Sequence, residues 1–540
     1  MSSNLKGACA LILLAYLPGN CLCQVKSTQA VNRAKIAVEM RFSMVDELLK
    51  QWYPASIDTV YGGFLSAFTY DFKPAANQDK MIVTQARHVW STSRASELFP
   101  SVTYYRKGAA QGYRFLRDVL WDKQYGGFYT FTDRQGVPKK SGFAPKEAYG
   151  NSFALYALAA YYRATGDTGA LKLAIKEFHW LEQHSHDPIY KGYFQHMERD
   201  GTPIKRTADI PSRSEFGYKD QNTSIHLLES LTELYAVWPD SLLKVRLREM
   251  QLLIRDKIVT PKGYLTLFFK TNWTPVSYVD SSEALILQHR GLDHVSFGHD
   301  VETAYLMLEA SHALGIKNDA VTETIAKKMV DHALRNGWDN KVGGFYDEGY
   351  YYKDKPGITI IADTKNWWAQ AEGLNSLLMM ADKYPYDTLR YEAKFEQLWQ
   401  YVKTYLIDHE HGDWYQGGLD KQPEYKTALK GQIWKGTYHN LRALINCTDR
   451  LNPDHIAPTI PKALTKYKIG ANGGLKWTAS RDNEHVLGYN VYLNGKRIAF
   501  TPLTQWVPID RRTLKKGNYV VRAVDLQDNE SGVSGVLKID

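Results

Sequence analysis

Cysteine is scarce in this chain of 540 residues, which contains four. Cys9, Cys21 and Cys23 lie close to the N-terminus, and Cys447 stands alone in the rest of the chain. If the N-terminal segment is removed, the remaining thiol has no partner for an internal disulfide, and a metal site built on cysteines is excluded. The mature fold must therefore be stabilised by its core.

Nucleotide-binding fingerprints and long basic runs are missing as well. The sequence contains neither a glycine-rich nicotinamide fingerprint nor a phosphate-binding loop, so no cofactor is indicated. The net charge of +9 is mild over this length, and no basic cluster indicates a nucleic-acid partner. A hydrophobic content of 44% and a charged content of 23% are typical of a soluble globular protein, which we expect to be a monomer.

Long apolar runs are limited to the N-terminus. Lys6 precedes an apolar run over residues 8–17, and a Pro-Gly pair follows it. This pattern predicts a secretory signal peptide over residues 1–23, cleaved after Cys23, because the run is too short to span a membrane. We therefore expect a secreted or periplasmic protein. Lipid attachment at Cys21 or Cys23 is an alternative that the residues before those cysteines fit poorly.

Aromatic residues, in contrast, are abundant, at 13% of the chain with 36 Tyr and 14 Trp. Either a large core or a carbohydrate cleft explains them. Some recur with glycine in a motif, since the Trp-Asp-x-x-x-Gly-Gly-Phe-Tyr of 121–129 returns at 338–346. Looser copies bring the number of Gly-aromatic turns to six, the others lying at 61–64, 191–194, 262–265 and 411–415.

The segments between these turns have apolar residues at helical spacing, as in 151–164 and 223–238. Each interval has room for two helices, so the sequence predicts six helical pairs. Six such pairs closed into a ring form an all-α (α/α)6 barrel, which we assign to residues 24–451. An open solenoid is the structural alternative.

The pattern changes after Leu451. A proline-rich linker is predicted over 452–463, and residues 464–540 alternate as β-strands do, with an Asn-Gly hairpin signal. Several short strands around a core tryptophan, Trp477, predict a small all-β sandwich. This region closely resembles a fibronectin type III module. It contains no catalytic cluster, and we expect it to contact a protein or a glycan.

Candidate functional residues lie where the predicted helices begin. Arg87 and Trp90 share a helix face, although an ordinary surface arginine explains that segment equally well. Asn222 and His226 are one turn apart at the start of an apolar helix. Capping of the buried helix is the structural alternative for this pair.

A second histidine, His299, begins another apolar helix with Glu302 at i, i+3. The carboxylate would hold the tautomer of the ring and raise its basicity. A metal site is the weaker interpretation, because no complete ligand set is spelled out nearby. Two further helix starts, 366–372 and 434–440, combine tryptophans with polar groups, and ring closure brings the last of these beside the first repeat.

Together these segments resemble the N-acylglucosamine 2-epimerase superfamily over about residues 30–450, and most closely its cellobiose or mannobiose 2-epimerase branch. Single matches are weak, but six in order across one barrel are specific. One departure is Asn151, because the family often has Gly-Gln-Ala where this chain has Gly-Asn-Ser, and we expect it to affect substrate detail. The matching pieces are Arg87 with Trp90; Ala148–Ala154; Asn222–Thr223 with His226; Gly298–Asp300 with Glu302; Trp367–Trp368 with Gln370–Glu372; and Trp434 with Tyr438–Asn440.

The resemblance implies a cofactor-free sugar epimerase without an essential metal. Its general acid/base pair would be His299 and His439, with Glu302 supporting His299. His226 and Asn222 would act on the ring oxygen and the open-chain aldehyde, and Arg87 would stabilise charge on oxygen. The other implied residues would bind the sugar, and they are Tyr149, Trp90, Trp368, Trp434 and Glu372.

The implied reaction inverts C2 at the reducing end of a β-linked disaccharide. Ring opening exposes an aldehyde that makes the C2 proton acidic, and two bases are needed, one on each face of C2. Histidine suits both roles because its pKa lies near working pH. Three alternatives stay open: a mannose or N-acylglucosamine isomerase or epimerase, a glycoside hydrolase using Asp122 and Asp339, and a binding protein without catalysis.

Overall fold

The computed structural model describes residues 19–469, 472–510 and 513–540. Six inner helices within these residues form a closed ring, because each packs against the next and the last packs against the first. The predicted (α/α)6 barrel is confirmed, and an open solenoid is excluded. The inner helices are α3 (Ile82–Leu98), α5 (Ala148–Thr165), α7 (Gln221–Val237), α10 (Phe297–Ala313), α12 (Trp367–Lys383) and α14 (Tyr438–Leu451).

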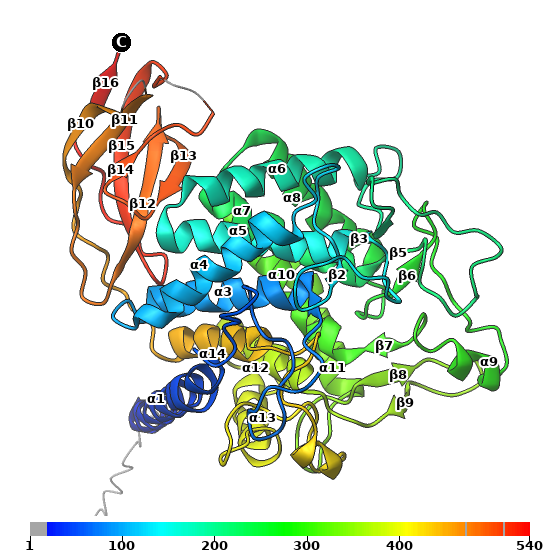
Figure 1. Cartoon of the computed structure of the whole chain (residues 1–540). Coiled ribbons are helices and arrows are strands. Elements are labelled where there is room, and N and C mark those ends of the chain that lie inside the picture. Colours follow the sequence, from blue (N-terminus) through cyan, green and yellow to red (C-terminus); the bar gives the residue numbers. More distant parts are fainter. Residues whose placement is uncertain (1–18, 470–471, 511–512) are drawn as a thin grey trace, which may run out of the picture.

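A second layer of helices surrounds the ring, one beside each inner helix (Figure 1). α1 packs against α14, so the two ends of the barrel segment meet. The outer helices are α1 (Gly19–Phe42), α4 (Thr103–Phe115), α6 (Thr168–His184), α8 (Ser241–Leu253), α11 (Ala320–Asn336) and α13 (Tyr391–Tyr405). Short segments extend helices or lie in loops, and they are η1 (Ser43–Leu49), α2 (Lys50–Trp52), η2 (Leu116–Leu120), η3 (Ile254–Ile258), α9 (Glu283–Gln288) and η4 (Pro423–Thr427).

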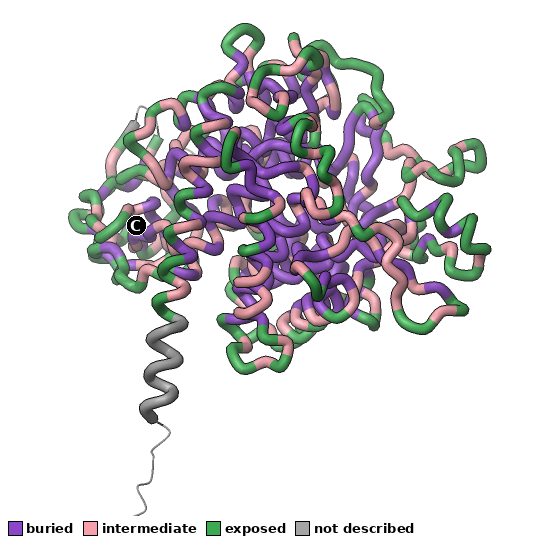
Figure 2. The backbone as a smooth tube through the Cα atoms, turned by 90° about the horizontal axis from the view of Figure 1, so that it is seen from below, coloured by how far each residue is buried: buried purple, intermediate pink, exposed green. Residues whose placement is uncertain are grey.

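Burial separates the two layers, since it concentrates in the centre of the barrel (Figure 2). On α5 every residue of 148–162 is buried, as expected for a helix surrounded by neighbours on all sides. On α4 the buried residues recur at helical spacing along one face. Gly112 allows that face to pack closely, because a Cβ there would lie 2.5 Å from the side chains of Phe64 and Val89.

Short sheets precede the inner helices at one end of the barrel. The strand before a helix pairs with a strand of the next repeat, which links the repeats around the ring. The pairs are β1 (Lys80–Met81) with β2 (Phe131–Thr132), β3 (Lys146–Glu147) with β4 (His196–Met197), β5 (Lys219–Asp220) with β6 (Phe268–Phe269), and β7 (Val295–Ser296) with β8 (Glu348–Tyr350), which also pairs with β9 (Thr359–Ala362).

The Gly-aromatic turns connect the outer helices to these sheets. In the second turn, Gly126 and Gly127 have φ angles of +71° and +68°, the left-handed region that favours glycine. The ring of Trp180 lies so close that a Cβ on either glycine would approach it to 2.7 Å. Asp122 accepts hydrogen bonds from two backbone amides and closes the turn. The double glycine is therefore a structural requirement of the repeat.

Five of the six turns in the described part of the chain contain a buried Lys–Asp pair. In the third repeat, Lys219 Nζ lies 2.7 Å from Asp187 Oδ2 and also donates to a backbone carbonyl. The equivalent pairs are Lys80–Asp58, Lys146–Asp122, Lys365–Asp339 and Lys430–Asp408. The fourth repeat has Thr260 and Val295 at these positions instead. Both members of the pair are therefore replaced together.

After α14 ends at Leu451, an extended linker leads to a β-sandwich. One sheet has the strand order β10-β11-β14 and the other β13-β12-β15-β16, and Trp477 packs between them against Tyr489. The fibronectin type III-like assignment stays a prediction. The strands are β10 (Lys462–Ile469), β11 (Asn472–Thr478), β12 (Val486–Leu493), β13 (Lys496–Thr501), β14 (Gln505–Trp506), β15 (Gly517–Asp525) and β16 (Leu537–Ile539).

The sandwich packs against the end of the barrel opposite the short sheets (Figure 1). Arg497 of β13 donates to the carbonyls of Tyr235 and Ala236, which lie in the last turn of α7 and have no partner within the helix. Tyr162 of α5 donates to the carbonyl of Phe500, whose side chain is buried in the core of the barrel. Polar and apolar contacts thus fix the sandwich to the barrel.

Most of the N-terminal predictions concern residues that the structure does not describe. Residues 1–18, which contain most of the predicted signal peptide, lie outside the described residues. The predicted cleavage point after Cys23 falls within α1. Among the helices that the structure describes, none is long and apolar enough to cross a membrane.

Candidate active site

Three histidines come together where the inner helices begin: His226 on α7, His299 on α10 and His439 on α14. They are close enough for the other two to affect the pKa of His299. Trp368 of α12 contacts two of them, since its ring centroid lies 4.6 Å from that of His299 and 5.8 Å from that of His439. Ring closure therefore gathers residues from distant repeats into one site.

Gly298 makes the contact between Trp368 and His299 possible. A Cβ at position 298 would lie 2.6 Å from the Cβ of Ala369 and 2.7 Å from the Trp368 ring. Any other residue there would push α10 and α12 apart. The glycine before His299 is therefore needed for α10 and α12 to pack this closely at the site.

Each of the three histidines has its Nδ1 atom held by a neighbour. His439 Nδ1 lies 2.5 Å from Glu372 Oε1, His226 Nδ1 lies 2.9 Å from Glu229 Oε2, and His299 Nδ1 lies 2.8 Å from Ser296 Oγ. None of the described residues hydrogen-bonds to Nε2 of these rings. With the proton on Nδ1, each ring presents a free lone pair at Nε2, where it can act as a base.

Arg442 of α14 connects the glutamates that stand behind the histidines. Its Nη2 atom lies 2.6 Å from both Glu302 Oε1 and Glu372 Oε1, and its Nη1 atom donates to Glu229. Arg442 and all three glutamates are buried. Because two of these glutamates hold histidines, one guanidinium links the supports of two rings.

Burial and neighbouring charges shift the pKa values of these three carboxyl groups to different extents. Burial, with the charge of Glu372, raises the pKa of Glu302 to about 8. Burial also raises the pKa of Glu372. Burial alone would raise the pKa of Glu229 too, but Arg442 and the hydrogen bonds to Glu229 outweigh it and lower that pKa to about 2. Glu229 is therefore an ionised partner of Arg442 at neutral pH.

The histidines themselves are uncharged at neutral pH. Burial lowers the pKa of all three, and most strongly those of His299 and His439. The positive charges of Arg87 and Arg442 add to this effect on His439. A neutral imidazole is the form that accepts a proton, so the environment prepares these rings to act as bases.

Four further predicted residues form one rim of the site. Arg87 Nη2 donates to the Tyr149 hydroxyl at 3.2 Å, and Nη1 donates to the carbonyl of Trp434 at 3.2 Å. Asn222 also hydrogen-bonds to Tyr149. Trp434 is 36% exposed, and its ring centroid lies 6.4 Å from that of Tyr149. Trp434 is thus an aromatic surface open to a ligand beside the buried polar groups.

Glu302 makes no hydrogen bond to His299, contrary to the prediction from their spacing. His299 lies in the first turn of α10 and hydrogen-bonds to Ser296, the residue directly before the helix. Glu302 binds Arg442 across the barrel instead. The i, i+3 spacing places two side chains on one face, but a charged partner on another helix decides where the carboxylate goes.

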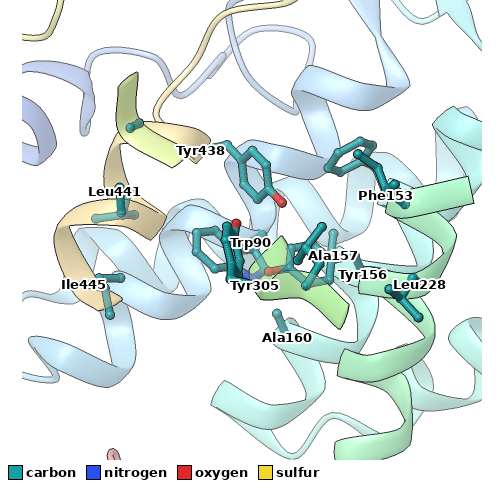
Figure 3. Close-up of a cluster of buried hydrophobic side chains, with 14 of the residues drawn as sticks. Trp90, Phe153, Tyr156, Ala157, Ala160, Leu228, Tyr305, Tyr438, Leu441 and Ile445 are labelled. Atoms are coloured by element: carbon teal, nitrogen blue, oxygen red, sulfur yellow. The ribbon is translucent and has the colours of Figure 1, made fainter. Parts of the chain in front are cut away.

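Trp90 and Glu372 were predicted to bind substrate, and the structure gives both a supporting position. Trp90 is buried, with its ring stacked on Tyr156 at 5.6 Å and edge-on to Tyr438 at 5.3 Å (Figure 3). Glu372 has both oxygens engaged, because Oε2 accepts a hydrogen bond from Tyr305 at 2.6 Å while Oε1 binds His439 and Arg442. Glu372 therefore has no unpaired oxygen left for a sugar, and Trp90 makes its ring contacts with other core aromatic residues.

The departure from the family pattern at Asn151 also has a structural role. Asn151 is fully buried, and its Oδ1 atom accepts a hydrogen bond from the backbone amide of Phe128 at 2.7 Å. This bond ties α5 to the second Gly-aromatic turn. The expected effect on substrate detail therefore has no support in these contacts.

Sequence reasoning missed Arg442, Glu229 and Ser296. A local signal exists for the first two, since Glu229 follows His226 by three residues and Arg442 follows His439 by three. Glu302 follows His299 at the same distance. A charged residue one helical turn after each histidine is therefore a pattern that the sequence contains.

A metal ion at the histidine site and a hydrolytic pair made by Asp122 and Asp339 both fit the described residues poorly. Glu302, Glu372 and His439 offer ligand atoms within 4.8 Å of one another, but Arg442 already binds both carboxylates. Asp122 and Asp339 lie in separate turns, each bound by backbone amides and a buried lysine. They are structural, as their repetition suggested.

Residues 62–443 match the family model described as N-acylglucosamine 2-epimerase (GlcNAc 2-epimerase). The chain belongs to this family. It is therefore a carbohydrate epimerase, an enzyme of the isomerase class.

Individual relatives agree with this assignment. The chain is 29% identical to the cellobiose 2-epimerase of Bacteroides fragilis over 420 residues, which cover 75% of this chain and 97% of the relative. It is 21% identical to the D-mannose isomerase of Marinomonas mediterranea over 410 residues, covering 74% and 94%. The solved structure of cellobiose 2-epimerase from Bacillus thermoamylovorans superposes with a TM-score of 0.66 at 26% identity, covering 77% of this chain and all of that one.

Proposed function

We propose that the protein inverts C2 at the reducing end of a β-linked disaccharide of the cellobiose or mannobiose type. The observation that carries this proposal is the group of three neutral histidines with Nδ1 held and Nε2 free. The choice of a disaccharide is supported by 29% identity to a cellobiose 2-epimerase, against 21% to a D-mannose isomerase.

In the proposed reaction, His226 moves the proton that opens the sugar ring. Glu229 stands behind it at 2.9 Å and stabilises the imidazolium that forms. The open chain has a C1 aldehyde, and a base then removes the C2 proton while the electron pair moves toward the carbonyl oxygen. Arg87, which hydrogen-bonds to Tyr149, would stabilise the resulting enediolate oxygen. No electrons leave the sugar, so the step needs no redox partner.

His299 and His439 would serve as the two bases, one on each face of C2. Both contact Trp368, which fixes their separation. One removes the proton, and the other returns a proton to the opposite face, which inverts the carbon. Positioned acid–base groups of this kind typically contribute about 10²–10⁴-fold each.

The second sugar of the substrate would lie against the exposed aromatic rim. Trp434 is 36% exposed, and Phe143 of a neighbouring loop meets it edge-on at 5.6 Å. Aromatic faces of this kind offer apolar contact without competing for the hydroxyl groups of a sugar.

Incubation in D2O with cellobiose, mannobiose and mannose tests the proposal. We expect each β-linked disaccharide that reacts to give its 2-epimer with one deuterium at C2. Absence of both exchange and product with all three sugars would exclude epimerisation. Release of monosaccharides would indicate hydrolysis, and reaction confined to mannose would assign a monosaccharide isomerase.

We also propose that the protein is secreted or periplasmic after cleavage behind Cys23, and that its sandwich is a fibronectin type III-like module. The N-terminal apolar run and the alternating pattern of 464–540 support these two proposals. N-terminal sequencing of protein purified from the exported fraction tests the first. A mature N-terminus at Gln24 is expected, and an intact Met1 would contradict export through this signal.

A further inference from the structure

A cavity of about 740 Å³ lies beside the fourth Gly-aromatic turn. Its walls come from the turn at 264–267, the loop at 275–279, the segment 293–295 and the segment 350–357. None of the three site histidines lines it, nor does Arg87. The cavity is therefore built from residues that the proposed reaction does not use.

The interruption of the repeat explains why space exists here. In the third repeat, the Lys219 ammonium runs to Asp187 and lies 4.9 Å from the centroid of the Trp273 ring. In the fourth repeat the lysine is replaced by Val295, whose short side chain is part of the cavity wall. The aspartate is replaced by Thr260, so no buried charge is left without a partner.

Tyrosine rings provide much of the lining. Tyr264 and Tyr351 stack with ring centroids 5.4 Å apart, and Tyr350 and Tyr352 lie 5.0 Å apart. All four line the cavity. Rings with polar edges suit a ligand that has both apolar faces and hydroxyl groups.

Three lysines line the cavity, and one of them, Lys262, has its ammonium 3.7 Å from the centroid of the Tyr351 ring. Lys353 and Lys355 pair with acidic residues of the α9 region at 2.6 and 3.1 Å. Asp293 uses Oδ2 to accept hydrogen bonds from the Tyr350 hydroxyl at 2.9 Å, from the Ser277 hydroxyl at 3.1 Å and from the backbone amide of Tyr278. Its Oδ1 atom has no partner among the described residues. One free carboxylate oxygen among tyrosines favours a neutral hydrogen-bond donor over an anion.

We propose that this cavity is a second saccharide-binding site, which takes neutral oligosaccharide units apart from the epimerisation centre. Its volume falls in the range of about 300–1,000 Å³ that is usual for small-ligand sites. Pyranose rings would pack against Tyr264 and Tyr350, because Lys262 and Lys355 already cover the rings of Tyr351 and Tyr352. A sugar hydroxyl would donate to Asp293 Oδ1. The site would hold the enzyme on longer glycans while a reducing end reacts elsewhere.

Titration calorimetry with cellotetraose and mannotetraose, each reduced to the alditol so that neither can be epimerised, tests this proposal. Val279 lines the cavity and is 36% exposed, so Val279→Trp closes the opening without entering the core. Asp293→Asn removes the accepting charge with little change in size. We expect each variant to weaken binding of at least one alditol by tenfold or more, with kcat/KM on a disaccharide within twofold of wild type.

The matched control is Trp434→Ala, which alters the aromatic rim of the histidine site. Two independent binding events, one removed by Val279→Trp and the other by Trp434→Ala, would support the proposal. Binding that only Trp434→Ala affects, or no binding of either alditol to wild type, would overturn it. Because the alditols are not substrates, these results do not depend on whether the enzyme epimerises disaccharides.

Discussion

Two regions of this barrel bury charged side chains, and they do so differently. In the turns, each lysine meets an aspartate and a backbone carbonyl, as Lys219 meets Asp187 at 2.7 Å. At the histidine site, one guanidinium, that of Arg442, faces three glutamates. Every buried lysine of the turns thus has its acceptors, and some of the pairs gain a further partner, as Lys365 does in Asp420. At the histidine site one guanidinium serves three carboxyl groups, and three imidazole nitrogens are left free.

The two arrangements of buried charge have different roles, because the pairs in the turns hold the fold and the cluster at the histidine site can transfer protons. A buried pair whose hydrogen bonds are all made holds its segment in one place and has no capacity left for a ligand. A buried cluster with raised and lowered pKa values and unused nitrogens is able to take and release protons. The following variants break each kind of arrangement in turn.

Arg442→Met should have the largest effect because it breaks the cluster at its centre. Removing one partner of a buried ion pair typically costs about 3–5 kcal/mol, and here the ionised Glu229 would be left without its main partner. Chemical denaturation should show this loss, together with loss of epimerisation. Arg442→Lys keeps a charge but not the forked geometry, so it should retain more stability than activity. Full activity in Arg442→Met would contradict the role of the cluster.

Lys219→Met should cost a similar free energy of unfolding, about 3–5 kcal/mol, without lowering kcat at temperatures where the fold persists. The chain provides its own control, since the fourth repeat shows which residues replace the pair. The double variant Lys219→Val with Asp187→Thr should recover most of the stability, because no charge remains unpaired. If the double variant is as unstable as the single one, the pair contributes more than charge balance.

Glu372→Gln should weaken catalysis while leaving the fold intact. The carboxylate lies 2.5 Å from His439 Nδ1, and an opposite charge at such a distance typically shifts a pKa by about 1–3 units toward the charged form. We expect kcat to fall by roughly 10- to 100-fold with KM little changed. Tyr305→Phe removes the other hydrogen bond of Glu372 and should have a smaller effect. Steady-state kinetics of both variants would show whether the carboxylate supports the base.

Glu177→Gln should have the smallest effect, and its sign depends on pH. Glu177 is fully buried, neither carboxyl oxygen has a partner among the described residues, and burial raises its pKa well above the usual value. A raised pKa in an acid contributes stability at low pH that is lost as pH rises. The variant should therefore equal wild type near pH 4 and gain about 1–2 kcal/mol over it near pH 8. Equal pH dependence in the two melting curves would show that Glu177 is not protonated in the fold.

The sequence was sufficient to predict the barrel because its signals are local and repeated. Gly126 and Gly127 have left-handed φ angles that glycine favours, and the segments between turns have helical periodicity throughout. His226, His299 and His439 were likewise found at helix starts, where a polar residue before an apolar run is visible in the sequence.

Side-chain contacts between helices across the ring were not predictable in the same way. The i, i+3 spacing of His299 and Glu302 predicted a contact that Arg442 prevents, and Arg442 stands 140 residues further along the chain. Trp90 shares a helix face with Arg87, but the ring of Trp90 packs on Tyr156, whereas Arg87 hydrogen-bonds to Tyr149 and to the carbonyl of Trp434. Partners on other helices depend on how the helices pack, which spacing along a single helix does not record.

The central claim is that His299 and His439 act on opposite faces of C2, and proton exchange in single variants tests it most directly. His299→Asn and His439→Asn should each lose epimerisation by about 10²–10⁴-fold. Each should still exchange the C2 proton of one disaccharide epimer with D2O, and the two variants should select opposite epimers. Exchange of the same epimer in both variants, or undiminished epimerisation in either, would contradict the two-base account.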